Sequence, residues 1–180
     1  SSGQEKGSVV FDGSTTALFK NGLKVGTLNT ALTFARNSLF EDFYNTTFEV
    51  NGVSVDGETR NCLLNIKRCS PKIEVKADET GVSLFISLNL FCNETDETAS
   101  SSDATNQKNN LIPESILKKA EENFTESFNE LVAVMKETGC DFLGVKEKIY
   151  RHNHRYYDKY KDSYMSDMNT YIKVTVEGQK

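Results

Sequence analysis

The most regular pattern in the chain is an alternation of side-chain types between residues 82 and 91. One parity is entirely aliphatic, and the other carries Ser, Asn and Phe. Because successive side chains of a strand point to opposite faces, this pattern predicts a strand with one buried face. A turn at Asp78-Glu79-Thr80-Gly81 joins it to the preceding segment. The aliphatic positions are Val82, Leu84, Ile86, Leu88 and Leu90.

Shorter strands are predicted nearer the start of the chain. Residues 16–19 and 23–25 flank Asn21-Gly22, a dipeptide that favours a two-residue hairpin turn because both turn positions need positive φ. Residues 48–55 are also strand-like, and Asn51-Gly52 inside them indicates a hairpin or a bulge.

Three more strands are predicted, two in the middle of the chain and one near its end. Residues 62–68 and 73–76 are predicted as separate strands with Pro71 at the break between them, because Pro cannot donate a ladder hydrogen bond. Residues 171–176 alternate again and predict a closing strand.

Apolar residues spaced by three and four predict helices in three places. A short helix covers residues 28–40, with Thr27 or Asn29 as its N-cap. The longest helix runs from Pro113 to about Thr138, and another from Asp141 to about His152. Strands come first, then helices, then one strand. This order favours an α+β fold in two layers, with helices on one face of a mostly antiparallel sheet.

The length of 180 residues fits a single domain. Residues 1–14 are rich in Gly, Ser and charged residues, and we expect a flexible lead or linker remnant before a domain at 15–178. Residues 93–110 contain no large apolar side chain. Such a segment buries too little surface to offset its ordering entropy, so we expect a mobile polar loop there.

Composition narrows the classes of function. The chain is 37% hydrophobic and 26% charged, which is ordinary for a globular protein. A net charge of −5 argues against sequence-independent binding of nucleic acid, so no such partner is predicted. The longest apolar stretch, residues 82–92, is too short and too polar to cross a bilayer.

No motif for catalysis or for a cofactor stands out. The chain has no Gly-x-Ser-x-Gly, Gly-x-Gly-x-x-Gly or Walker-type sequence. Its only histidines, His152 and His154, lie at a predicted helix end, where solvated cationic groups are favoured. We interpret the two histidines as solvated surface residues. A shared metal ion or a catalytic role is the weaker interpretation. We therefore predict no catalytic residue, no cofactor and no metal site.

The four cysteines are widely spaced and include no Cys-x-x-Cys pair, so we interpret them as small buried hydrophobic side chains. Cys62 and Cys69 lie seven positions apart and would point to opposite faces of one continuous strand. The other two are Cys92 and Cys140.

Tyrosines gather after the predicted helix at 141–152. Tyrosine suits recognition surfaces because it offers a large apolar area with a polar tip. It also packs helices against sheets with its hydroxyl at the rim, which is the stronger of the two interpretations. The positions left open as an interface are Tyr156, Tyr157, Tyr160 and Tyr164.

Two stretches carry a resemblance to a known family. Residues 17–28 read ALFKNGLKVGTL and residues 140–151 read CDFLGVKEKIYR. They resemble the opening hairpin and the Asp-aromatic/aliphatic-Gly helix of the C-terminal domain of the Ger(x)C family, the lipoprotein C subunit of spore germinant receptors. The likeness spans about residues 14–178. The family usually has a Trp after this helix, whereas the chain has none. The motif positions are Phe19, Lys20, Gly22, Gly26, Asp141, Gly144, Glu147 and Tyr150.

The resemblance implies a role without catalysis. It implies a scaffold domain of the C subunit, needed for nutrient-triggered germination and working with integral-membrane A and B subunits. The full-length protein would be held at the outer face of the spore inner membrane by a lipidated N-terminal Cys that this chain lacks. Two alternatives remain: an extracytoplasmic ligand-binding or adhesion module and, more remotely, an enzyme using His152 or His154.

The resemblance and the residue types together suggest architectural roles for four of the motif positions. We expect Gly22 and Gly26 to allow the hairpin and its exit. We expect Asp141 to cap its helix and Gly144 to allow the helix to approach a neighbour closely.

Overall fold

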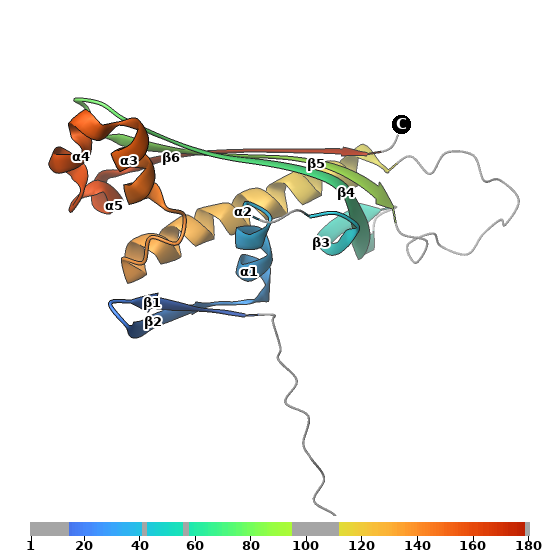
Figure 1. Ribbon diagram of the computed structural model, residues 1–180. Helices are drawn as coiled ribbons and strands as arrows, with labels where there is room; N and C mark the ends of the chain where they lie inside the picture. The colour runs from blue at the N-terminus through green and yellow to red at the C-terminus, as the bar shows by residue number, and fades with distance from the viewer. Residues whose placement is uncertain (1–14, 41–42, 56–57, 95–111, 179–180) are drawn as a thin grey trace, which may run out of the picture.

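The computed structural model describes residues 15–40, 43–55, 58–94 and 112–178. It contains a four-stranded sheet with helices on one face and a separate two-stranded hairpin (Figure 1). The predicted α+β class, with a mostly antiparallel sheet, is confirmed. The predicted lead at 1–14 and most of the loop predicted at 93–110 lie outside the described residues, whereas residues 93 and 94 end a strand.

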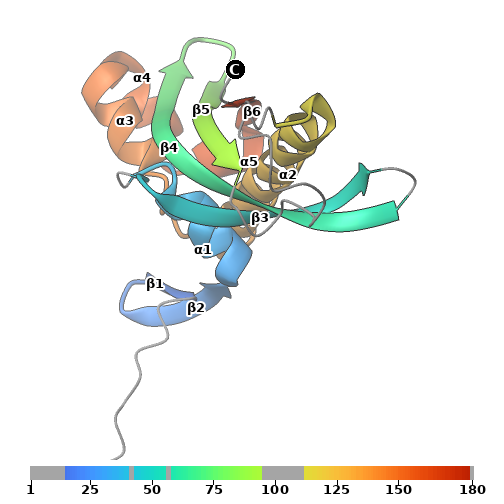
Figure 2. The ribbon, with the colours of Figure 1, turned by 90° about the vertical axis from the view of Figure 1, so that its right-hand side faces the viewer.

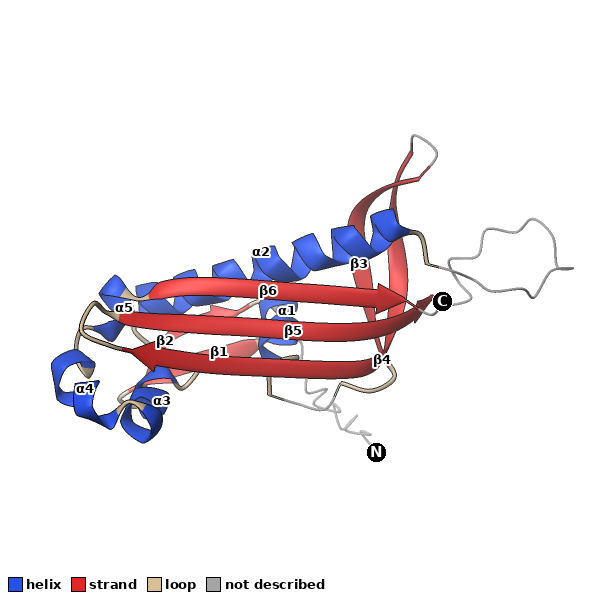
Figure 3. Ribbon diagram, turned by 90° about the horizontal axis from the view of Figure 1, so that it is seen from above, coloured by secondary structure: helices blue, strands red, loops and turns tan. Residues whose placement is uncertain are grey.

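The main sheet has the strand order β3-β4-β5-β6. The first two pairings are antiparallel, and β5 and β6 run parallel, which the sequence pattern did not indicate. Figure 3 shows β4, β5 and β6 side by side, with the longest helix running along β6. The strands are β3 (Thr46–Val55), β4 (Glu58–Ala77), β5 (Val82–Glu94) and β6 (Asn169–Gly178).

Strand β4 is continuous over 20 residues, so the prediction of two separate strands was wrong. The reason lies in its neighbour, because β3 pairs with β4 only from Glu58 to Ile66. Beyond Ile66 one side of β4 has no partner among the described strands. Pro71 lies in this part and pairs across with Leu88 on the other side. Pro is tolerated at a sheet edge, where its missing N–H breaks no ladder.

A bulge between Ile66 and Arg68 changes which side chains of β4 point inward. Before the bulge the even-numbered residues are buried, and after it the odd-numbered ones face the core. Cys62 and Cys69 therefore share the inner face, contrary to the expectation from simple alternation. Cys62 and Cys92 are buried, and burial raises the pKa of the Cys92 thiol to about 12.

The helices differ from the predicted ones mainly at their ends. Asn29 caps α1 by accepting a hydrogen bond from Leu32 N at 2.8 Å, as one of the two expected caps. The helix predicted from Asp141 begins only at Val145, and the tyrosine-rich stretch forms two more helices. The helices are α1 (Thr30–Asn37), α2 (Glu114–Thr138), α3 (Val145–His152), α4 (His154–Tyr160) and α5 (Tyr164–Asp167).

Helix α2 and the inner face of the sheet form the core. Phe128, at the middle of α2, is fully buried, as are Leu84 and Leu88 of β5. Burying each such side chain stabilises the fold by about 1.5–3 kcal/mol. The buried residues of α2 are Ile116, Ala120, Phe124, Phe128, Leu131, Val132 and Met135.

Polar side chains bond to exposed strand edges at three places. Asn153, between α3 and α4, donates to Val75 O at 3.1 Å and accepts from Ala77 N at 3.2 Å, which occupies the free side of β4. Two residues of α2 act similarly. Glu121 accepts from Val176 N of β6 at 2.9 Å. Asn123 accepts from Asn51 N of β3 at 3.1 Å. Each contact satisfies backbone groups that would otherwise invite pairing with another chain.

The hairpin of β1 (Thr16–Lys20) and β2 (Leu23–Leu28) is a sheet of its own, on the side of α2 away from the main sheet (Figure 1). Asn21 and Gly22 have φ of 52° and 80°, as the predicted turn requires. At Gly26 an added Cβ would lie 3.1 Å from Thr138 Cγ2, so this glycine lets β2 approach the end of α2.

Candidate interaction surface

The two motif stretches meet at one end of the molecule. The Cys140 thiol donates to the carbonyl oxygen of Phe19 at 3.4 Å, 121 positions away in sequence. Lys20 lies against Gly139, directly after α2. The hairpin thus contacts the segment that links α2 to α3, and Figure 1 shows both at the same end of the molecule.

The hairpin exposes large apolar side chains. Phe19 is 60% exposed, Leu23 73% and Val25 36%. Lys20 and Lys24 are also exposed, and residues 15–28 contain no carboxylate. We call these five side chains the hairpin surface. The register pairs Phe19 with Lys24 and Lys20 with Leu23, so the two faces of the hairpin each expose one apolar and one basic side chain beside the turn. Exposed apolar side chains gathered on one small element mark a candidate site of contact with a partner.

Asp141 organises the start of α3. Its carboxylate accepts hydrogen bonds from Val145 N at 2.8 Å and Lys146 N at 2.7 Å, so it caps the helix as the sequence suggested. It also accepts from the hydroxyl of buried Tyr164 at 3.0 Å. Burial, together with the adjacent Asp141 carboxylate, raises the pKa of Tyr164. The phenol therefore stays protonated and keeps α5 tied to α3.

Gly144 has φ of 70° and no atom within 4 Å of where a Cβ would lie. Its glycine is explained by this left-handed backbone, and the close approach expected from the sequence is absent. Glu147 and Tyr150, also on α3, are exposed, and Glu147 pairs with Arg151.

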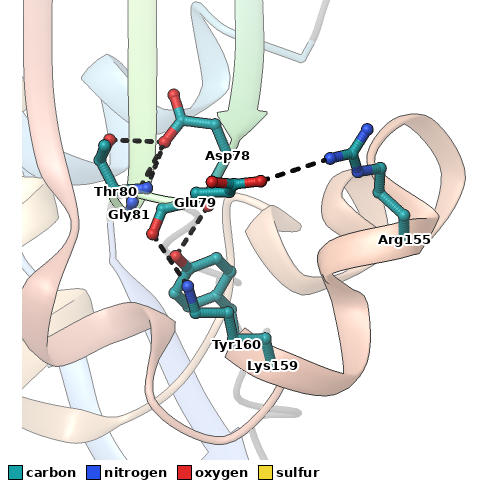
Figure 4. A network of polar contacts seen from close by, with 7 residues as sticks. All are labelled: Asp78, Glu79, Thr80, Gly81, Arg155, Lys159 and Tyr160. Carbon is teal, nitrogen blue, oxygen red and sulfur yellow. Dashed lines mark hydrogen bonds and ion pairs between the residues drawn. The ribbon is translucent and has the colours of Figure 1, made fainter.

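Helix α4 is fastened to the turn between β4 and β5, as Figure 4 shows. The Tyr160 hydroxyl donates to Asp78 O at 2.8 Å, and Lys159 Nζ donates to Glu79 O at 2.9 Å. Arg155 lies 3.8 Å from the Glu79 carboxylate. These contacts hold the tyrosine-rich segment against one end of the sheet.

The remaining tyrosines contact other side chains at the surface. The Arg155 guanidinium lies 4.5 Å from the centroid of the Tyr156 ring. The Tyr157 ring centroid is 5.1 Å from that of Tyr150, and His154 lies 5.0 Å from Tyr150 in the same cluster. All four tyrosines thus make contacts within the molecule, and a contact with a partner stays a prediction.

Sequence reasoning missed the residues that bond to the sheet edges. Asn153 sits between the two histidines, and Glu121 and Asn123 lie on what looks like an ordinary polar helix face. No spacing marks such residues, because their partners lie on distant strands. Within the described part of the chain, no three His, Cys, Asp or Glu side chains lie close enough to hold a metal ion, and no helix is long and apolar enough to cross a membrane.

Together the fold and the hairpin surface define an α+β domain with exposed apolar side chains at one end. The sequence model of the family described as "Spore germination B3/ GerAC like, C-terminal" matches residues 14–179. The chain therefore belongs to this family, and the resemblance found in its two motif stretches is confirmed.

A solved structure has the same fold. The structure titled "Crystal Structure of the GerBC protein" superposes with a TM-score of 0.65 at 14% sequence identity. The match covers 88% of this chain and 48% of the GerBC chain, so the chain spans about half the length of that protein. No curated protein matches the chain significantly.

Proposed function

We propose that this domain is a non-catalytic scaffold of the C subunit of a spore nutrient germinant receptor, and that nutrient-triggered germination requires it. The family match over residues 14–179 carries the proposal. The fold shared with GerBC supports it. The partners are integral-membrane A and B subunits, and an N-terminal lipid anchor on the full-length protein holds the domain at the outer face of the spore inner membrane.

The hairpin surface is the contact with a partner subunit. Its three apolar side chains lie on β1 and β2, close to the Asn21-Gly22 turn that joins the two strands. The ladder between β1 and β2 fixes their backbone before a partner binds, which lowers the entropic cost of binding. Large side chains at the centre of an interface usually carry most of the binding energy. Tyr156 and Tyr157 of α4 are partly exposed as well and form a second candidate contact, separate from the hairpin surface.

A germination assay tests the scaffold role. In the bacterium that carries the gene, the full-length subunit is compared with a version that lacks residues 14–178. Spores with the deletion are expected to lose the response to the nutrient while the partner subunits still reach the membrane. A normal response in the deletion spores would contradict the proposal.

A double variant tests the hairpin surface. F19S/L23S removes two exposed apolar side chains, and we expect partner binding to weaken about 10- to 100-fold, with a matching loss of nutrient response. The control is A133S, a change at an exposed position of α2. Both subunits are measured by immunoblot in the membrane fraction. Equal responses of F19S/L23S and A133S spores would place the contact elsewhere.

A further inference from the structure

A groove lies between α1, α2 and the free edge of β3, with a volume of about 360 Å³. In Figure 2 β3 is the outer strand of the sheet, with α1 below it. The groove lies apart from the hairpin surface, and none of the motif residues lines it.

The floor of the groove is aromatic. The Phe48 ring of β3 packs edge to face on Phe124 of α2 at 5.3 Å. Phe34 of α1 completes the floor, with its centroid 6.2 Å from Phe48 and 6.1 Å from Phe124. Phe34 and Phe48 are only partly buried, so part of each ring can be reached by an apolar group from outside.

One wall of the groove is backbone. The N–H of Asn51 points away from β4, because it donates to Asn123 Oδ1 on α2. N–H and C=O groups of alternate residues in a strand point to the same side, so those of Thr47 and Glu49 also point to the free edge. Both residues line the groove. In the described part of the chain no hydrogen bond closes these edge groups.

We propose that this groove binds an extended peptide segment of a partner protein, which pairs with β3 as an added strand and places an apolar side chain on Phe34, Phe48 and Phe124. The added strand supplies the hydrogen bonds that Thr47 and Glu49 lack, and the aromatic floor selects the side chain. Asn123 already occupies Asn51 N, so the pairing stops there.

The geometry of β3 also defines the peptide. The side chain opposite Phe48 points inward and must be apolar, whereas those opposite Thr47 and Glu49 point to solvent. Among the described residues, Glu49 is the one charged side chain that lines the groove. Its Oε1 accepts a hydrogen bond from Asn61 Nδ2, and its Oε2 is left for a partner. The segment therefore carries Lys or Arg opposite Glu49, next to a bulky apolar residue.

A chain-like ligand fits this site better than a compact small molecule. A small apolar compound can cover the phenylalanines, but it leaves the edge groups of Thr47 and Glu49 without partners. Only an extended backbone satisfies both parts of the groove. The inference is independent of the germinant-receptor role and is tested on the isolated chain.

Selection from a phage-displayed library of random nonapeptides identifies the preferred sequences on the 180-residue chain. Three variants serve as comparison baits. A31F fills the groove from an exposed position of α1, and A133F adds the same ring on α2 outside it. T47P removes an edge N–H while leaving the ladder to β4 intact. Amide NMR spectra confirm that each variant is folded, and A31F alone suffices if T47P is not.

The expected result is enrichment of peptides with a basic residue beside a bulky apolar one in an alternating pattern. The best peptide should bind A133F like the original chain and lose at least tenfold in affinity on A31F and on T47P. Absence of enrichment, or equal binding to A31F and A133F, would overturn the proposal. So would N-acetylphenylalanine amide binding as tightly as the peptide, because that outcome defines a small-molecule site.

Discussion

The Asn153 side chain bonds to the edge of β4 as a residue of a neighbouring strand would, with one donor and one acceptor. Replacing it by Ala leaves Val75 O and Ala77 N without partners where α3 covers them. We expect Asn153→Ala to lower the free energy of unfolding by about 1–3 kcal/mol, measured by urea denaturation.

The neighbouring histidine supplies the control for this change. His152 is exposed, so His152→Ala should change stability by no more than about 0.5 kcal/mol. If the two variants unfold at the same urea concentration, the side-chain contact of Asn153 adds nothing to stability.

At the scale of elements, the contact between the hairpin and α2 depends on the absence of one methyl group. A Cβ at Gly26 would lie 3.1 Å from Thr138 Cγ2. Thr138→Ser removes that methyl and keeps the hydroxyl, which donates to Val134 O. Gly26→Ala changes the free energy of unfolding, and we expect this change to be about 0.5–1 kcal/mol more favourable to the folded state in the Thr138→Ser variant than in the original chain.

A double-mutant cycle measures this coupling whether Gly26→Ala alone stabilises or destabilises. The four chains (original, two single variants and the double variant) are unfolded in urea under one set of conditions. If the changes in the free energy of unfolding of the two single variants add up to that of the double variant, the hairpin can shift away from α2 without a loss of stability.

Elements whose signal is local were predictable from the sequence. The Asn21-Gly22 turn, the alternation in β5 and the helical spacing of α2 each depend on neighbours within a few positions. The continuity of β4 through Pro71 is different, because it depends on where β3 stops. The bulge after Ile66 and the parallel pairing of β6 likewise arise from distant contacts.

The same reasoning applies to the surfaces. The motif stretches identified the hairpin and the Asp141 cap, since capping is a short-range pattern. The groove of the further inference brings together Phe34, Phe48 and Phe124, which are far apart in sequence. In the sequence each phenylalanine is an ordinary candidate for the core. Only the fold could show that Phe34 and Phe48 stay partly exposed.

For the whole molecule, the turn between β4 and β5 should contribute to a loss of stability in acid. The Asp78 carboxylate accepts hydrogen bonds from the Thr80 hydroxyl and from the Thr80 and Gly81 N–H groups, which lowers its pKa below the ordinary 3.8. When the pKa of a carboxyl group is lower in the folded state than in the unfolded state, the group stabilises the fold at pH values above its unfolded-state pKa. That contribution is lost as the pH falls through the folded pKa.

Asp78→Asn tests this dependence because Asn keeps an acceptor oxygen but does not titrate. Between about pH 5 and 2 the variant should lose less thermal stability than the original chain, measured as the difference in Tm. Identical slopes would mean that Asp78 is not part of the acid response. Glu49→Gln, on another strand and without a comparable turn, is the control.

The parallel pairing of β6 has a consequence for how the chain is made. Between Glu94 and Asn169 the ribosome must add α2 to α5, and until β6 emerges the side of β5 that it covers has no partner. Pairing across so long a separation is intrinsically slow. Folding therefore finishes only after β6 has been synthesised. Nascent chains that stop before Asn169 are expected to aggregate, and a chaperone that shields apolar strands would be most useful during this interval.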